Sequence, residues 1–211
     1  MGHLVNQRQV ARCMTGSWGL RTDVGKAWRR PTKAEQDLGV AIVLGHFLIM
    51  VLPFAMAFAA AMDLQTLTIP NRVSVVLIGA FFAAALVAGL SWQDVLVHLA
   101  AGSAMLLVGI FMFSMGWLGG GDAKLLAAGA LWIGFDQLAP FLVYVGLSGG
   151  ILAMMLLAYR KSPTATVVAA HLPSWAERLR TKGGGIPYGI AIAAGAMVVF
   201  PSTQLFTLLA V

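Results

Sequence analysis

Six long apolar segments follow one another along this chain and restrict its fold more than any other feature. Their approximate bounds are residues 39–62, 73–90, 95–115, 123–135, 137–159 and 188–211. Five of them have 18 to 24 residues, enough for a helix rising 1.5 Å per residue to cross a hydrocarbon layer of about 30 Å. The fourth is shorter, so we expect a span enclosed by the others and followed by a tight turn at 134–136. The sequence therefore predicts an all-α membrane helix bundle with about six transmembrane helices.

The composition agrees with a membrane protein. Of the 211 residues, 59% are hydrophobic and 10% are charged, whereas soluble domains carry about 25% charged residues. The formal net charge of +6 comes from basic residues that lie almost entirely outside the apolar segments, so we attribute it to membrane topology and the lipid bilayer rather than to nucleic acid. Cys13 is the only cysteine, which excludes an internal disulfide and a four-thiolate zinc site. We expect no metal and no cofactor.

The polar and basic residues 1–38 form a separate N-terminal tail ahead of the membrane domain at 39–211. A secretory signal peptide has an apolar stretch close behind its charged region, and none begins here before Val40. We expect a disordered tail or one that is not native.

Lysine and arginine are distributed unequally between the two faces that six alternating spans define. Three loops share one face: residues 62–72, 116–123 and 160–187. Together with Lys124 at their edge, these loops contain seven basic residues. The loops on the other face contain none. By the positive-inside rule the first face is cytoplasmic. The basic tail then falls on the opposite side, which conflicts with this orientation.

The acidic residues of the membrane domain lie at the ends of spans, where a carboxylate is least costly. Asp63 ends the first span and Asp122 opens the fourth, which places both on the same face. Asp94 belongs to a predicted capping box with Ser91. Asp122 is also a good candidate for the N-cap of the fourth span, as Asn71 is for the second, so capping and catalysis both remain open for Asp122 on these grounds.

Two carboxyl groups that share a poorly solvated site hold one proton between them, and such a pair can activate water while protonating a leaving nitrogen. This chemistry requires neither a metal nor a nucleophilic side chain. The chain lacks the His-Glu-x-x-His pattern of zinc peptidases. The three glycines before Asp122 would allow the backbone to approach a substrate strand closely.

At these residues the chain resembles the type IV prepilin peptidases, the bacterial branch of the GxGD membrane aspartic peptidases. Three motifs carry the resemblance, in the family's order and at span boundaries of one face. They are Asp63 ahead of Ile69-Pro70-Asn71, then Gly119-Gly120-Gly121-Asp122-Ala123-Lys124-Leu125, and Ile186-Pro187-Tyr188-Gly189. The resemblance covers roughly residues 40–205.

The resemblance implies an aspartic endopeptidase that removes leader peptides from prepilin or pilin-like precursors at the cytoplasmic face of the bacterial inner membrane. The catalytic pair would be Asp63 and Asp122. Substrate-binding or supporting positions would be Gly119, Gly121, Lys124, Pro70, Asn71, Pro187, Tyr188 and Gly189. The chain lacks the region with paired cysteines that larger members use for N-methylation, so it resembles the short, peptidase-only members of Flp/Tad pilus systems.

Other interpretations remain open at this stage. A small membrane transporter or scaffold could use the same carboxylates to bind a cation or to cap helices. A related peptidase could act on archaellin-like precursors or general signal peptides. Lys124 could be an interfacial anchor, and Pro187 with Tyr188 could serve to start a helix at the membrane surface.

Overall fold

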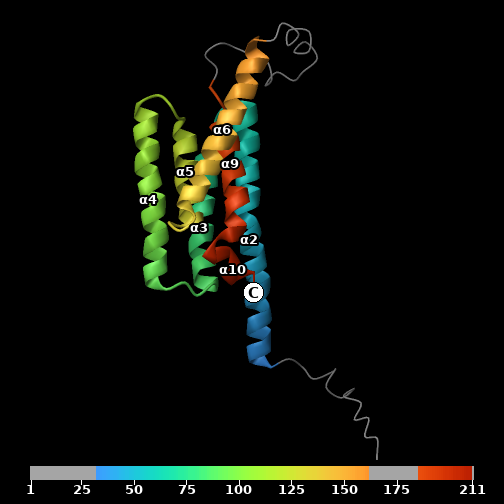
Figure 1. Cartoon of the computed structure of the whole chain (residues 1–211). Helices are drawn as coiled ribbons and strands as arrows, with labels where there is room; N and C mark the ends of the chain where they lie inside the picture. The colour runs from blue at the N-terminus through green and yellow to red at the C-terminus, as the bar shows by residue number, and fades with distance from the viewer. Residues whose placement is uncertain (1–31, 162–184, 211) are drawn as a thin grey trace, which may run out of the picture. The chain divides into compact units, whose positions relative to one another are not determined.

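The computed structural model describes residues 32–161 and 185–210. These residues are almost entirely helical and contain no β-strand, so the predicted all-α bundle is confirmed (Figure 1). The helices are α2 (Lys33–Thr66), α3 (Asn71–Val87), α4 (Trp92–Ser114), α5 (Gly120–Ile133), α6 (Leu138–Lys161), α9 (Tyr188–Val199), the 3₁₀ turn η2 (Phe200–Ser202) and α10 (Gln204–Leu209). The predicted tail up to residue 31 and most of the 160–187 loop lie outside the described residues.

Three helices are long and apolar enough to cross a membrane: α2, α4 and α6. Two further apolar stretches, Asn71–Val87 and Tyr188–Ser202, are shorter. Large apolar side chains are exposed along the long helices, among them Val43, Leu107 and Met154. An exposed apolar surface of this extent fits a protein whose solvent is lipid.

The short helix α5 lies at the centre of the bundle and contacts α3, α4, α6 and α9. Most of its side chains are buried, from Asp122 to Ile133, which confirms the prediction that the protein encloses this short helix. Near its C-terminal end, Trp132 is fully buried and its indole N–H donates to the Leu77 carbonyl of α3 at 2.9 Å. This bond fixes α5 against α3 on one side.

The turns at the ends of the helices follow local sequence signals. Ser91 and Asp94 form the predicted capping box at the start of α4, with the Ser91 Oγ accepting from the Asp94 amide and the Asp94 carboxylate accepting from the Ser91 amide. Gly134 ends α5 with a φ of 75°, a left-handed conformation that favours glycine. The tight turn predicted at 134–136 is therefore present.

The last apolar segment differs from the prediction of one continuous span over 188–211. Helix α9 ends at Val199, and a 3₁₀ turn containing Pro201 separates it from α10. Proline lacks the amide hydrogen that the next helical bond needs, and its ring clashes with the preceding turn. The Thr203 hydroxyl then accepts from the Phe206 amide and starts α10.

The first helix also starts earlier than the predicted span. Thr32 and Glu35 exchange hydrogen bonds between side chain and backbone, with the Thr32 amide donating to the Glu35 carboxylate at 2.7 Å. This reciprocal pattern is a capping box, and α2 begins directly after it at Lys33. The last residues assigned to the tail by sequence therefore belong to α2.

Candidate active site

Three helix ends that are far apart in sequence meet at the end of the bundle where α5 and α9 begin (upper end in Figure 1). Asp63 lies in the last turn of α2, and the amide of Gly189, in the first turn of α9, donates to its Oδ2 at 2.7 Å. Asp63 is 3% exposed. The start of a helix presents amide hydrogens and a partial positive charge, so it is a suitable partner for a buried carboxylate.

Glycine is required at position 189 for this contact. A Cβ atom there would lie 2.8 Å from Asp63 Oδ2 and 3.0 Å from the Ile69 Cδ1, closer than side chains pack. Pro187 is the N-cap of α9, and proline is well suited to starting a helix because its missing amide hydrogen is not needed there. The third motif thus brings the start of α9 to Asp63. The sequence had placed this motif and Asp63 on the same face of the membrane.

Asp122 lies in the first turn of α5 and is 7% exposed. The N-cap of this helix is Gly119, so the interpretation of Asp122 as the N-cap is wrong. Among the described residues its Oδ1 atom is buried and has no hydrogen-bond partner. A buried acceptor without a partner is costly, and one beside a second carboxyl group marks a place for a proton, a water molecule or a substrate group.

Asp63 and Asp122 are close enough to interact electrostatically, and the Gly189 amide interacts with both of them. Both aspartates line one pocket of about 250 Å³. The other lining residues come from the segment after α2 and from the start of α5: Leu67, Thr68, Ile69, Asn71, Gly119, Gly120 and Gly121. The two carboxylates predicted to form a pair are therefore brought together at one pocket.

The glycines before Asp122 make room mainly for the chain itself. A Cβ on Gly121 would lie 3.1 Å from the Ile69 Cβ, and a Cβ on Gly119 would lie 2.9 Å from Asp122 Oδ2. The small size of Gly121 lets the start of α5 pack directly on Ile69, in the segment that follows α2, and the small size of Gly119 leaves room for the Asp122 carboxylate. The three glycines also line the pocket that the two aspartates share.

Comparison with known protein families gives the deciding observation. A model of the type IV leader peptidase family matches residues 50–154, a range that contains both aspartates, the C-terminal half of α2 and the whole of α5. The chain belongs to the type IV leader peptidase family. It is accordingly a peptidase, and its apolar helices make it an integral membrane protein. No curated protein and no solved structure matched the chain.

Not every residue that the motifs single out lines the aspartate pocket of this peptidase. The Lys124 ammonium donates to the Asn71 Oδ1 at 2.9 Å and lines a neighbouring groove, whereas Tyr188 lines a pocket on the α6–α9 side. The prediction that Asn71 caps α3 is wrong, because Pro70 is the N-cap and the Asn71 side chain accepts from Lys124 instead.

Sequence reasoning missed Leu67 and Thr68, which line the pocket between Asp63 and the Ile-Pro-Asn motif. Leu67 has a φ of 54°, a left-handed conformation that is unusual for a leucine and is often retained at functional sites. Leucine as a residue type does not indicate this left-handed conformation. Its place a few residues after the aspartate is the one signal that could have directed attention to it.

Within residues 32–161 and 185–210, no group of three or more His, Cys, Asp or Glu side chains is placed to hold a metal ion.

Proposed function

We propose that this peptidase is an aspartic endopeptidase that removes the leader peptide from Flp-type prepilin precursors at the cytoplasmic face of the bacterial inner membrane. Asp63 and Asp122 would be its catalytic residues. The observation that carries the proposal is the buried carboxyl pair at a pocket, with the Gly189 amide donating to Asp63 and with Asp122 Oδ1 left unpartnered among the described residues.

The pair would hydrolyse a peptide bond in the state that holds one shared proton. The ionised carboxylate removes a proton from water, whose oxygen adds to the carbonyl carbon of the scissile bond, while the protonated carboxyl group donates its proton to the carbonyl oxygen. In the second step the carboxyl group that holds the proton from water gives it to the nitrogen and the C–N bond breaks. The other, now ionised, carboxylate takes a proton from a hydroxyl group of the tetrahedral carbon, which regains its carbonyl. Each cycle consumes one water molecule and returns the pair to its starting state.

The roles of acid and base belong to the pair rather than to either residue. The Gly189 amide holds Asp63 in place at 2.7 Å, which restricts its rotation. Asp122 Oδ1 is the atom that is available to water or to the shared proton. A fixed geometry of this kind lowers the entropic cost of bringing water, carboxylates and substrate together.

The narrower substrate assignment rests on sequence. The three motifs resemble those of the prepilin peptidases, and we extend the resemblance to the short, peptidase-only members of Flp/Tad systems. The rival function in ion transport is less well supported, because the carboxylates lie in the last turn of α2 and the first turn of α5, beside a pocket, rather than in the middle of these helices.

Co-expression with a tagged Flp-type prepilin tests the proposal. Leader removal would be scored by gel shift and N-terminal sequencing for the wild type and for Asp63→Asn and Asp122→Asn. Asp94→Asn is the matched control, since this acid caps α4 and is not part of the pocket. We expect cleavage by the wild type and the control and none by the other two variants. Near-normal processing by either Asp63→Asn or Asp122→Asn, with the protein inserted in the membrane, would refute the assignment.

A further inference from the structure

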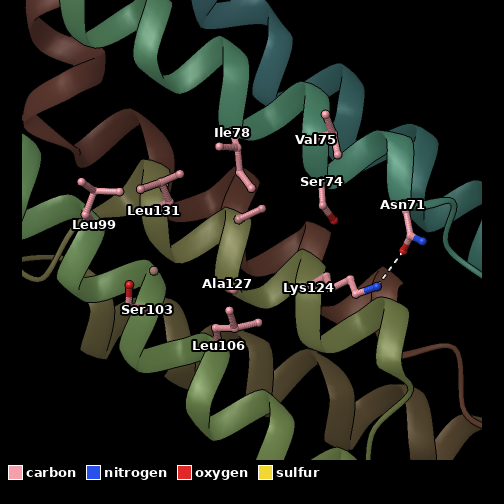
Figure 2. Close-up of a pocket in the computed structure, with 12 residues that line it drawn as sticks. Asn71, Ser74, Val75, Ile78, Leu99, Ser103, Leu106, Lys124, Ala127 and Leu131 are labelled. Carbon is pink, nitrogen blue, oxygen red and sulfur yellow. Dashed lines mark hydrogen bonds between the residues drawn. The ribbon is translucent and has the colours of Figure 1, made fainter.

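An apolar groove lies next to the aspartate pocket, on the side of α5 that faces α3 and α4 (Figure 2). It has a volume of about 400 Å³. Helices α3 and α4 form its walls, and each packs on α5. The face of α5 between them is the floor of the groove.

The floor is a stripe on the same helix that carries Asp122. It consists of Lys124, Ala127, Ala128 and Leu131, spaced three and four residues apart so that they share one helix face. The small side chains of the two alanines leave space above the floor, and Ser103 and Gly102 leave space along the α4 wall. Small residues are what allow one membrane helix to approach another closely.

The groove and the aspartate pocket adjoin each other at Asn71, which lines both. A second apolar pocket, which includes Tyr188 and lies on the α6–α9 side of α5, shares no lining residue with the aspartate pocket in the described part of the chain. A chain whose scissile bond occupies the aspartate pocket would therefore enter the groove beside Asn71, the residue that the two share.

The polarity of the groove changes along this path. Its end beside the aspartate pocket is polar, where the Lys124 ammonium donates to Asn71 Oδ1 at 2.9 Å (Figure 2). Farther along it is lined by apolar side chains such as Ile78 and Leu106. An ammonium group has three hydrogens, so Lys124 can donate to a carbonyl group of a bound chain while keeping its bond to Asn71.

We propose that this groove binds the apolar, membrane-embedded segment adjoining the scissile bond of the substrate, with Lys124 holding the backbone between the two. The proposal rests on the proposed function and extends it to how the substrate is recognised. The volume suits the side chains along one face of such a segment, while the rest of the segment stays in lipid. A lipid acyl chain is the competing occupant, and it would not need the groove to adjoin the aspartate pocket.

Filling the groove tests the proposal. Ser103→Leu on the α4 wall places a larger side chain in the groove, and Ala83→Leu, on an exposed part of α3 outside it, is the matched control. The substrates are a full-length Flp-type prepilin and a short peptide that ends a few residues beyond the scissile bond and lacks the apolar segment. We expect Ser103→Leu to raise KM for the full-length precursor about tenfold, to leave kcat nearly unchanged and to leave cleavage of the short peptide unaffected. Unchanged KM for the full-length precursor would overturn the proposal while leaving the peptidase assignment intact.

Photo-crosslinking provides a second measurement that does not depend on the folding of Ser103→Leu. A photoreactive amino acid at position 78 in the Asp122→Asn background should crosslink to the apolar segment of the full-length precursor. Crosslinks to lipid alone, with wild-type enzyme still cleaving the precursor, would overturn the proposal. If the wild type cleaves neither substrate, the proposed function itself fails, which is a distinct result.

Discussion

Replacing Gly189 by alanine should disturb catalysis through one defined contact. The added Cβ would lie 2.8 Å from Asp63 Oδ2, whereas ordinary contact begins at about 3.4 Å. Relief of this overlap requires a shift of about 0.6 Å, which would lengthen the amide–carboxylate bond from 2.7 Å to about 3.3 Å. That distance is beyond the usual range of a hydrogen bond to a charged oxygen.

The expected loss follows from the strength of that bond. A hydrogen bond to a charged group contributes about 1.5 to 3 kcal/mol, which corresponds to roughly a ten- to 150-fold change in rate if the bond positions Asp63 for the reaction. We expect kcat to fall within this range, with a smaller effect on KM, because Gly189 touches the aspartate rather than the proposed groove.

The assay compares purified Gly189→Ala with the wild type and with Gly185→Ala in detergent, using a tagged Flp-type prepilin. Gly185 lies in the same segment, and a Cβ there meets nothing within 4 Å, so the same change should be silent. Cleavage rates are divided by the amount of protein that elutes as a monodisperse peak in size-exclusion chromatography. This normalisation separates a loss of activity from a loss of folded protein. A wild-type kcat for Gly189→Ala would refute the view that this amide positions Asp63.

The remaining predictions concern the pair, its surroundings and the bundle. The cleavage rate should show a bell-shaped pH profile, because low pH protonates both carboxyl groups and removes the base, whereas high pH ionises both and removes the acid; a flat profile between about pH 4 and 9 would contradict a shared proton. Adding EDTA should leave the rate unchanged, and a loss that zinc restores would show that a metal takes part. Lys124→Ala and Asn71→Ala should raise KM by similar factors, because Asn71 holds the Lys124 ammonium group. The double variant should raise KM by no more than either single variant. Additive effects on KM would show that the two residues act independently. Trp132→Phe should lower the free energy of unfolding by about 1 kcal/mol by removing the bond to Leu77, without changing the rate, and an unaltered thermal midpoint would contradict this.

Much of the fold could be predicted because lipid imposes a simple rule on the sequence. A chain that crosses hydrocarbon must satisfy its backbone within helices, so apolar length alone located α3, α4, α5 and α6 to within a few residues. The short apolar run of α5 was recognised as enclosed by protein, and its buried side chains confirm this. Hydropathy failed at the last segment, because it does not register that Pro201 ends a helix inside an apolar run.

The sequence could place Asp63 and Asp122 on the same face of the membrane, because an even number of spans separates the two helix ends that carry them. The atoms that hold them could not be predicted in this way. The Gly189 amide contact and the left-handed Leu67 depend on how α9 and the segment after α2 pack. The capping interpretations of Asp122 and Asn71 were reasonable from residue preference, yet tertiary contacts overrode them.

The central claim is that Asp63 and Asp122 act as one catalytic unit. The most direct test is the cleavage rate of purified Asp63→Asn, Asp122→Asn and the double variant on the same prepilin precursor. Residues that act as a unit give non-additive losses, so we predict that each single variant is inactive or nearly so and that the double variant is no slower than either. A single variant that still cleaves at close to the wild-type rate, or losses that multiply in the double variant, would contradict the account.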